Sequence, residues 1–594
     1  MVSRKMLQNP RPAGHATSVP MIQNHGTPPP LPEHPALTSG LITYLGNKRS
    51  LLAFIWEAMM RIAAEQGPLR TMADPFTGSG VVARLGRLAG MEVHARDKED
   101  YTLPFGRAFL EVTPQDVEKL FSRFGGYPTA LAVLNSLESP QKPESRYFSR
   151  HYAPQDTGDA DPARERLFYT QENARRIDAV LEVLHGSNIN EAERLGIDGS
   201  PEGRLRRDIL LASLLVEMSV HNNTSGVMKG YHHGWGGRGG DALGRIMGRV
   251  ELEPLSFIDG PRGTASVGAA KELSSAPDGA EFDLAYLDPP YTIHQYGANY
   301  HLLTSAVRYD FYDPGPVAQG ARAGIRSDHY RSDFCRRGGE RATQALATVL
   351  AQLRARTLLV SYNNDGIIPP QRMVELLGAN GAHTVELMSR RYHKFRGGKA
   401  TQGAVRTREY LFLVYRHRPQ SQEDRSAMEA GIEELVAERE LHDRFIIPAR
   451  WRDAGGSAHR GANGSWRLGG TADLSVVLDR ELRVVDVELP SDQSEARAAR
   501  AAITAASSGP IEAAGAAIAD HDWAAALRLL KRLKIAKYQK DFQRLSDLFA
   551  AEAATPGGPT GLQMEELRRL RVRILGKEFA VSRSEPEGPG RKRR

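Results

Sequence analysis

The feature that most constrains this chain is a proline-rich turn at the end of an apolar segment. The run Phe282-Asp283-Leu284-Ala285-Tyr286-Leu287 leads directly into Asp288-Pro289-Pro290-Tyr291. An apolar run of this length that stops at a polar turn is typical of a buried strand ending at a sheet edge. Two successive prolines fix two φ angles and remove two N–H donors, so the turn is rigid.

The groups on this turn suit the binding of a planar molecule that carries an exocyclic amine. The Asp288 carboxylate and the Pro289 carbonyl can accept the two amine hydrogens, and the Tyr291 ring can stack on the plane. An isolated Asp-Pro-Pro would be explained better by ordinary turn chemistry at a strand end. A second motif, upstream in the chain, favours the binding interpretation.

That second motif is a glycine-bearing turn between a strand and a helix. Residues 71–73 read as the strand, Asp74-Pro75-Phe76-Thr77-Gly78-Ser79-Gly80 as the turn, and residues 81–88 as the helix. Glycines at such a turn let a ligand approach the backbone and leave helix N–H groups pointing at it. The next strand, 91–95, leads to Asp97, the position where nucleotide-binding α/β units carry a ribose-binding carboxylate. The Gly-Lys-Ser/Thr of a phosphate loop is absent, which argues against an NTPase.

A third motif, Tyr44-Leu45-Gly46-Asn47-Lys48, precedes a predicted amphipathic helix that starts near Leu51 and ends at Gly67-Pro68. The chain has 594 residues, which suggests two to four domains, and its net charge of +7 is weak support for a nucleic-acid partner. A single cysteine, Cys335, excludes a disulfide framework and suits the cytoplasm. We expect no membrane span and no secretory signal, because no apolar run is long enough.

The pattern divides the chain into three parts. Residues 1–36 are predicted to be a disordered leader, 37–419 an α/β domain, and 420–594 an appendage of unknown role with a basic disordered tail. Within the α/β domain, 101–258 reads as a mostly helical insert. Further predicted elements are helices at 175–184, 205–220, 421–441 and 523–549, strands at 357–362, a hairpin of 385–392 with 410–415, a hairpin at 474–489, and glycine-rich linkers at 455–470 and 554–561.

The order of the three motifs resembles the Dam-like, or alpha-order, adenine-specific DNA methyltransferases. The loop 44–48 comes first, then 74–80, a long insert, and 288–291 last, so the resemblance covers roughly residues 41–416. It implies a Rossmann-like methyltransferase sheet, S-adenosylmethionine as methyl donor and methyl transfer to adenine N6 in double-stranded DNA. It also implies a role in restriction–modification or phage defence, with a cognate restriction or defence protein as a further partner, and the insert as the target-recognition subdomain.

The resemblance further implies roles for single residues. Tyr44, Gly46, Asn47 and Lys48 would lie near the methionine end of the donor. Asp74, Phe76, Gly78 and Gly80 would form its main pocket, with Asp97 on the ribose, and Asp288, Pro289, Pro290 and Tyr291 would bind the target base. The family places an acid near the donor's adenine, whereas the corresponding segment here, Val267-Gly268-Ala269-Ala270-Lys271, has no carboxylate.

Polar and basic loops supply the candidate DNA contacts. Amide, imidazole and guanidinium groups in the insert are of the kind that read base edges, although an ordinary polar loop is an equal explanation. The basic loop between the strands at 385–392 and 410–415 suits phosphates better than bases. The candidates are Asn222, Asn223, Lys229, His232 and Arg238 in the insert, and Arg391, Lys394, Arg396 and Lys399 in the basic loop. No cluster has metal-ligand spacing, so we expect no metal site.

Two alternatives stay open from the sequence. Cytosine presents a similar amine, so N4-cytosine methylation is possible chemically, although the motif order favours adenine. A DNA-binding protein on a methyltransferase scaffold that no longer binds the donor is the other alternative, and the missing acid makes it worth testing.

Overall fold

The computed structural model describes most of the chain, and all structural statements below refer to the described residues. These are 29–237, 239–240, 242–317, 322–363, 366–379, 383–393, 406–442, 444–453, 455–461, 465–470, 474–478, 482–488, 493–533 and 539–575. They form two compact units, the first up to Arg390 with Tyr410–Arg425 added, the second from Arg391–Glu409 and Ser426 onward. The domain boundaries expected at residues 36, 101, 258 and 419 stay predictions.

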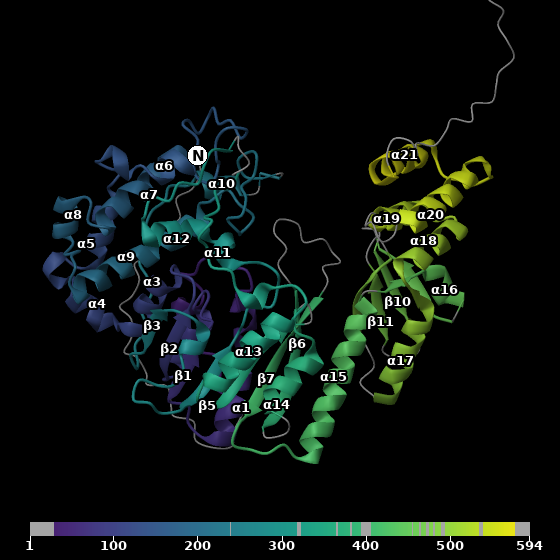
Figure 1. The fold of residues 1–594 in the computed structure, drawn as a ribbon, viewed down its shortest axis with the longest axis horizontal. Coiled ribbons are helices and arrows are strands. Elements are labelled where there is room, and N and C mark those ends of the chain that lie inside the picture. The colour runs from purple at the N-terminus through teal and green to yellow at the C-terminus, as the bar shows by residue number, and fades with distance from the viewer. Residues whose placement is uncertain are drawn as a thin grey trace, which may run out of the picture. The chain divides into compact units, whose positions relative to one another are not determined.

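A seven-stranded, mostly parallel sheet is the centre of the first unit (Figure 1), in the order β3-β2-β1-β4-β5-β7-β6. Strand β1 pairs in parallel with both β2 and β4, β2 with β3, and β4 with β5. This confirms a mixed α/β fold with a large, mostly parallel sheet. The strands are β1 (Thr71–Asp74), β2 (Glu92–Asp97), β3 (Thr264–Val267), β4 (Phe282–Leu287), β5 (Ala355–Asn363), β6 (Thr384–His393) and β7 (Arg406–Tyr415).

The strand order reverses direction between β1 and β4. The chain steps outward from β1 to β2 and β3 on one side, and from β4 to β5 on the other. Ligands of open α/β sheets bind at such a switch point, beyond the carboxyl ends of the strands. Here β1 ends at Asp74 and β4 at Leu287, directly before Asp288, so two of the three sequence motifs begin at the switch point.

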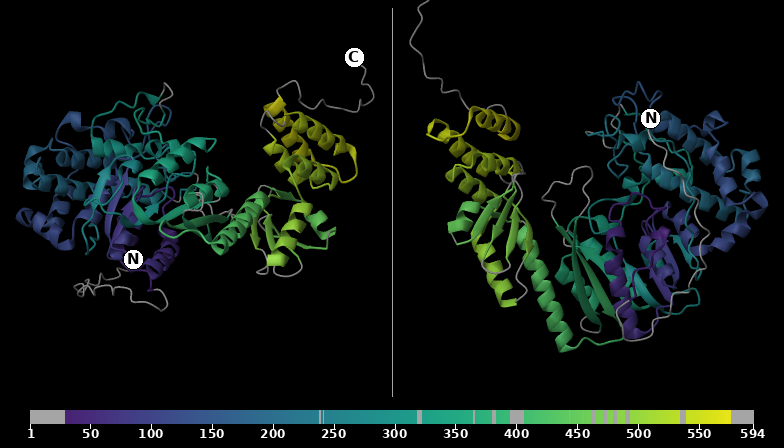
Figure 2. Two further views of the ribbon diagram at one scale, coloured as in Figure 1. Left: turned by 60° about the horizontal axis from the view of Figure 1, so that its bottom comes forward. Right: turned by 180° about the vertical axis from the view of Figure 1, so that it is seen from behind.

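Helices cover both faces of the sheet. Figures 1 and 2 show α13 (Glu340–Gln352) and α14 (Pro370–Gly378) on one face and α1 (Leu52–Gln66) on the other. The predicted first helix is α1, and it ends where expected because Gly67 adopts φ +91°. Helix α2 (Val81–Leu88) matches the predicted range and follows Gly80, which adopts the left-handed φ of +76°.

The segment between β2 and β3 is mostly helical, and most residues of its longest helix, α9 (Pro201–Val220), are buried. Its aromatic and aliphatic side chains form one core with α12 (His301–Arg308), through Leu302, Leu303 and Ala306. The helices predicted at 175–184 and 205–220 are α7 and α9. The helices of this segment are α3 (Thr102–Gly106), the π-helical turn Arg107–Glu111, α4 (Pro114–Phe121), α5 (Tyr127–Asn135), α6 (Phe148–His151), α7 (Gln171–Leu184), α8 (Ile189–Arg194), α9 (Pro201–Val220) and α10 (Leu243–Met247); α11 (Tyr296–Asn299) precedes α12.

The second unit contains an antiparallel sheet of order β12-β11-β10-β9. The predicted hairpin is β11 (Ser475–Leu478) with β12 (Val484–Glu488). The prediction of a glycine-rich linker at 455–470 is wrong, because β9 (Ser457–Arg460) and β10 (Trp466–Gly469) lie there and pair with each other and with β11. Glycine content alone does not reveal these short strands, because their glycines lie at the strand ends. Leu468, within β10, is buried.

The single helix predicted at 523–549 is also wrong, because the structure has two helices, α19 (Trp523–Arg532) and α20 (Gln539–Ala551). Leu530 and Phe542 pack into one core, together with α18 (Pro510–Ala519) and α21 (Gly561–Leu575). One continuous helix of that range would be about 40 Å long and could not bring both apolar stripes onto one core. The remaining elements are α15 (Gln422–His442), β8 (Phe445–Ile446), α16 (Pro448–Asp453), α17 (Gln493–Ala506) and β13 (Ser507–Ser508).

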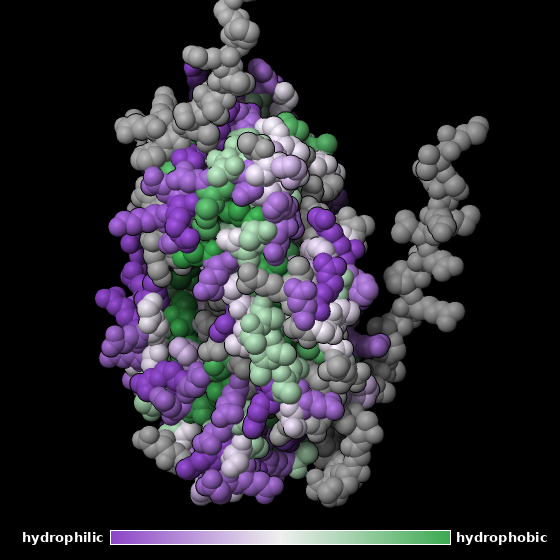
Figure 3. Space-filling model, turned by 90° about the vertical axis from the view of Figure 1, so that its right-hand side faces the viewer, coloured by the Kyte–Doolittle hydropathy of each residue, from purple (hydrophilic) through white to green (hydrophobic). Residues whose placement is uncertain are grey.

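The face seen in Figure 3 is largely hydrophilic, with smaller hydrophobic strips between the hydrophilic side chains. Among the described residues, no helix combines the length and the apolar character that a bilayer crossing requires. The same residues contain no group of three or more His, Cys, Asp or Glu side chains arranged to hold a metal ion.

Candidate active site

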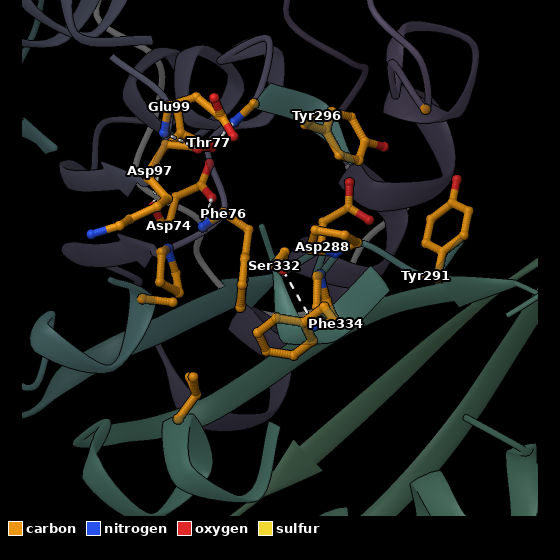
Figure 4. A pocket seen from close by; sticks show the side chains of 18 of the residues that line it. Asp74, Phe76, Thr77, Asp97, Glu99, Asp288, Tyr291, Tyr296, Ser332 and Phe334 are labelled. Carbon is orange, nitrogen blue, oxygen red and sulfur yellow. Dashed lines mark hydrogen bonds between the residues drawn. The ribbon is translucent and has the colours of Figure 1, made fainter. Parts of the chain in front are cut away.

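A cavity of about 550 Å³ lies at the switch point of the sheet, and residues of all three sequence motifs line it. Figure 4 shows Asp74, Phe76 and Asp97 on one side of this space and Asp288 and Tyr291 on the other. The glycine turn and the proline turn, which are far apart in the sequence, therefore face one another across one cavity. This volume is in the range of pockets that hold molecules of cofactor size.

The glycine turn is held in shape by its own carboxylates and backbone. The Gly78 N–H donates to Asp97 Oδ2 at 2.8 Å, and the Phe76 N–H donates to Asp74 Oδ1 at 3.3 Å. Gly78 adopts φ +52°, and a Cβ placed there would lie 3.0 Å from the Tyr44 ring. Glycine is therefore required at 78 both by the backbone conformation and by the close approach of the first motif.

Several acids line this cavity, and their pKa values are raised. Burial raises the pKa of the Asp74 carboxyl well above its ordinary value, and the charges of Asp288 and Asp97 raise it further. Burial also raises the pKa of Asp97, against the opposing effect of the N–H groups of Gly78 and Glu99. The pKa of Glu99 rises to about 8, first through burial and then through the neighbouring Asp97. A cationic ligand in this cavity would lower these pKa values and favour the ionised carboxylates.

The proline turn is tied to the first motif by an ion pair. Lys48 Nζ lies 3.0 Å from Asp288 Oδ1, and the two side chains are 4% and 18% exposed. The same ammonium lies 5.1 Å from the centroid of the Tyr291 ring. The Tyr291 carbonyl accepts a hydrogen bond from the Ile367 N–H at 3.0 Å, and its ring packs edge-on against Tyr362 at 5.7 Å. Lys48 was expected at the donor's methionine end, and the structure brings it to the proline turn.

Several cavity residues were not found by sequence reasoning. Glu99 lies two positions after Asp97, and its acidity was the available signal. The Tyr296 hydroxyl donates to the Leu45 carbonyl at 3.1 Å, and the Phe334 ring packs edge-on against Phe76 at 5.2 Å. Phe334 and the lining face of α13 come from a distant part of the chain without a local motif, so no sequence signal identifies them. The other lining residues that were missed include Tyr330, Ser332, Asp333, Arg341, Gln344 and Thr348.

Of four further residues expected at the donor, Tyr44 and Gly46 line the cavity and Asn47 and Gly80 do not. The Tyr44 ring stacks on Tyr300 at 4.9 Å and lines the cavity. Gly46, at φ +81°, lies where a Cβ would be 3.4 Å from the hydroxyls of both Tyr291 and Tyr296. Asn47 accepts the Arg49 N–H at 2.8 Å through Oδ1 and does not line the cavity. Gly80 also lies outside the lining, at the start of α2.

The segment without the family's acid does line the cavity, through Ala269, Ala270 and Lys271. The nearest carboxylate in sequence is Glu272, and it is engaged elsewhere: its Oε2 lies 2.6 Å from Arg96 Nη1 and accepts the Ala269 N–H at 3.1 Å. Glu272 therefore fixes the turn and does not replace the missing acid.

Two of the residues expected to contact DNA are buried in the structure. The Asn222 amide donates to the Met218 and Ser219 carbonyls, and the Asn223 amide donates to the Leu167 and His232 carbonyls, all within buried backbone. Both side chains are 3% exposed or less, so they shape the loop and are not presented to DNA. Lys229 is exposed and His232 half-buried. Arg238, Lys394, Arg396 and Lys399 lie outside the described residues, and of Arg391 only the backbone, in β6, is described.

Comparison with known proteins agrees with this geometry. Residues 262–314 match the model of the D12 class N6 adenine-specific DNA methyltransferases, a range that contains β4 and the proline turn. The chain is 26% identical over 381 residues to the type II methyltransferase M.NlaIII of Neisseria lactamica, which is 63% of this chain and 99% of that protein. It is 25% identical to the type II methyltransferase M.CviAII of Paramecium bursaria Chlorella virus 1, over 63% of this chain and 98% of that protein.

A third relative is larger. The chain is 28% identical over 347 residues to the modification methylase LlaI of Lactococcus lactis subsp. lactis, which is 56% of this chain and 48% of that protein. The resemblance to adenine-specific DNA methyltransferases that the motif order predicted is thus confirmed. More than a third of this chain lies outside the similarity to M.NlaIII and M.CviAII.

Proposed function

We propose that this chain is a site-specific DNA methyltransferase that transfers a methyl group from S-adenosylmethionine to the N6 amine of an adenine flipped out of the duplex. One observation carries the proposal. The segment that matches the adenine-specific family contains Asp288–Tyr291, and this turn shares one cavity with the glycine turn at the switch point of the sheet. The proposal explains why an amine-binding turn and a nucleotide-type turn lie together.

The donor set of the cavity fits S-adenosylmethionine, which carries a sulfonium and an ammonium group. Asp74, Asp97 and Glu99 have raised pKa values and lie without a lysine or arginine within ion-pair distance among the described residues, so a bound cation would favour their ionised forms. The glycine turn, at Gly78, lets a ligand approach the backbone. We assign Asp97 to the ribose and the Tyr44–Lys48 loop to the methionine end. When bound, the donor supplies an electrophilic methyl group.

The proline turn would prepare the amine for attack. Adenine N6 is a weak nucleophile because its lone pair is delocalised into the ring. Hydrogen bonds from its two N–H groups to the Asp288 carboxylate and the Pro289 carbonyl would favour a tetrahedral nitrogen and localise that pair. The localised pair would then accept the methyl group that the donor supplies, with the carbon–sulfur electron pair left on the sulfur and one N6 proton released to solvent. Positioning and electrostatics supply the rate acceleration.

Lys48 would act through Asp288 on this step. Its ammonium, 3.0 Å from Oδ1, favours the ionised carboxylate and fixes its direction. A carboxylate has about four acceptor positions, so pairing with Lys48 leaves room for the amine hydrogen. Lys48 is thus a positioning residue in this mechanism, in addition to its expected place near the donor.

The target base must leave the duplex stack to reach the cavity. Extrusion costs a few kcal/mol, and stacking on an aromatic side chain offsets part of it. Tyr291 would supply that ring, held by Tyr362 and by the Ile367 N–H. We further propose that the helical segment 101–258 takes part in target recognition, with Lys229 and His232 as candidate contacts.

The biological setting follows from the relatives, whose names describe type II methyltransferases and a modification methylase. We propose that the chain modifies DNA in a restriction–modification or defence system, beside a cognate restriction or defence protein. We place this action in the cytoplasm, where a lone reduced cysteine such as Cys335 is ordinary.

The test is the analysis of modified bases in DNA from cells that express the full chain. We expect N6-methyladenine at one sequence context with the wild type, and N4-methylcytosine instead would select the cytosine alternative. The isosteric variant Asp288→Asn should lose at least about 100-fold in methyl-transfer rate and keep donor binding. Asp278→Asn, at an exposed aspartate on the loop before β4, is the matched control and should keep full activity.

Two results would contradict the proposal. Full activity of Asp288→Asn would exclude the proposed role of the Asp288 carboxylate in binding the amine. A wild-type chain that binds no S-adenosylmethionine at millimolar concentration would favour the scaffold alternative, a DNA-binding protein without the donor.

A further inference from the structure

A second cavity, of about 700 Å³, lies in the helical segment of the first unit, away from all three sequence motifs. We propose that this cleft, here called the arginine cleft, binds the phosphate backbone of duplex DNA; the inference rests on the proposed function and assigns it a DNA-holding surface. Five arginines line it, Arg146, Arg150, Arg164, Arg166 and Arg175, against two carboxylates, Glu165 and Asp313.

The two carboxylates are already used in turns of the chain. Glu165 accepts the Gln155 N–H at 2.8 Å through Oε1 and the Asp161 N–H at 2.9 Å through Oε2. Asp313 accepts the Gly315 N–H at 2.9 Å. Hydrogen bonds to backbone N–H groups direct these carboxylates at the loops, so they do not pair with the arginines of the cleft.

Most of the arginines point their charge at solvent. Arg146, Arg150, Arg164 and Arg175 are exposed. Within the described chain no carboxylate lies within ion-pair distance of Arg146, Arg150 or Arg175, and Arg164 has only a long contact of 3.7 Å to the exposed Asp161. Guanidinium groups without carboxylate partners, gathered in one concavity, create a positive potential that attracts an anion.

Arg166 indicates which kind of anion fits. It is the buried arginine of the set, and its guanidinium donates to the carbonyls of Arg322, His151, Pro314 and Gly315. Its N–H groups therefore hold the walls of the cleft together and are not offered to a ligand. A compact phosphate ester would need buried donors, whereas the exposed arginines come from separate elements and suit an extended polyanion.

The walls of the cleft connect it to the candidate active site. Asp313 and Gly315 belong to the chain between α12 and α13, and the same connection supplies Tyr330, Ser332 and Phe334 to the donor cavity. The Tyr147 hydroxyl donates to the Tyr312 carbonyl at 2.9 Å and fixes that connection to the start of α6. DNA held at the arginine cleft is thus held by the same stretch of chain that forms part of the cavity.

The experiment measures binding of a fluorescein-labelled duplex of arbitrary sequence to the full chain at several salt concentrations. Arbitrary sequence suffices because phosphate contacts are sequence-independent. The variant combines Arg146→Gln, Arg150→Gln and Arg175→Gln. The control combines Arg123→Gln, Arg194→Gln and Arg204→Gln, which removes the same charge from exposed arginines of the same helical segment that do not line the cleft.

We expect the cleft variant to bind the duplex between about 8-fold and about 500-fold more weakly at 0.1 M salt, for one to three lost phosphate contacts, with a shallower salt dependence. The control should change affinity by less than about threefold. Equal affinities of the two variants would overturn the proposal, as would tighter binding of the wild type to single-stranded RNA of the same length. Donor binding by both variants confirms that they are folded.

Methyl transfer by the wild type is measured separately, so the two proposals can fail independently. An active wild type whose cleft variant binds duplex normally would leave the methyltransferase proposal intact and remove the cleft. A wild type that transfers no methyl group would refute the methyltransferase proposal, whatever the result of the duplex titration.

Discussion

Lys48→Met is the most informative single change, because it removes the ammonium of the ion pair with Asp288 and preserves the length of the side chain. At the observed 3.0 Å separation, two unit charges attract by about 5.5 kcal/mol at an effective dielectric constant of about 20. Removal of one partner of a buried pair costs about 3–5 kcal/mol. Because Asp288 is 18% exposed, we take the lower end, about 3 kcal/mol.

If that energy is lost from the transition state, methyl transfer slows by about 100-fold, since each 1.36 kcal/mol is tenfold. The assay is single-turnover transfer of a labelled methyl group to DNA, with donor affinity measured in parallel by calorimetry. We expect the donor dissociation constant to change by less than about threefold, because the lysine acts on the carboxylate. Lys271→Met is the control, at an exposed lysine that lines the same cavity.

The Asp288→Asn background tests whether Lys48 acts through Asp288. In that background Lys48→Met should slow the reaction by less than about threefold more, because the charge it compensates is gone. A Lys48→Met variant that loses donor affinity by the same factor as rate would refute the reasoning, and would make the lysine a donor contact, as the family resemblance alone implied. An unchanged methyl-transfer rate together with an unchanged donor affinity would show that the Lys48–Asp288 ion pair has no role in the reaction.

Two further predictions concern the donor side of the cavity. Burial raises the pKa of Glu99 to about 8, so ionising this carboxyl costs free energy in the ligand-free fold. The free energy of unfolding should therefore fall as the pH rises from about 5 through 8, and Glu99→Gln should flatten that slope in urea titrations. Parallel pH profiles of the wild type and the variant would contradict this prediction. Gly78→Ala places a methyl group 3.0 Å from the Tyr44 ring at φ +52°, so donor affinity in calorimetric titrations should fall by about tenfold or more. Gly90→Ala is the control, because Gly90 also has a positive φ, +85°, but no neighbour within 4 Å, and this variant should keep the donor affinity of the wild type.

Local signals in the sequence predicted the elements that carry the site. The apolar run before Asp288 is β4 over the expected residues, and the helix after the glycine turn is α2 over the expected residues. Both elements are bounded by residues with strong backbone preferences, glycine at 80 and proline at 289, so the local sequence determines where they begin or end. The glycine turn and the proline turn lie at the same sheet edge because they follow the carboxyl ends of β1 and β4, two adjacent parallel strands.

Residues that reach the cavity from distant segments were not predictable in this way. Tyr330 and Phe334 lie in an irregular connection, and Gln344 lines the cavity through the packing of α13. No periodicity or turn signal marks them, because their position depends on tertiary contacts. The same limit applies to the five arginines of the cleft, which are dispersed over residues 146–175.

The asparagines at 222 and 223 show why polar residue types alone mislead. A side-chain amide that reads a base edge in one protein can satisfy backbone carbonyls in another, because the donors are identical. Asn223 donates to carbonyls at residues 167, 232 and 234, so it joins a glycine-rich loop that lacks regular backbone pairing to the segment before α7. The sequence does not distinguish the two uses, since burial decides between them.

The two cavities of the first unit differ in the groups that they offer to DNA, and this difference bears on how a base could be selected. Five arginines line the arginine cleft, and their guanidinium groups attract phosphates. In the cavity at the switch point, Lys48 is already paired with Asp288, and the raised pKa values of Asp74 and Glu99 favour their neutral forms. We therefore expect the phosphates of a DNA strand to bind at the cleft. The base is the part of a nucleotide whose amine the Asp288 carboxylate can accept, so this arrangement favours extrusion of a base over entry of the backbone.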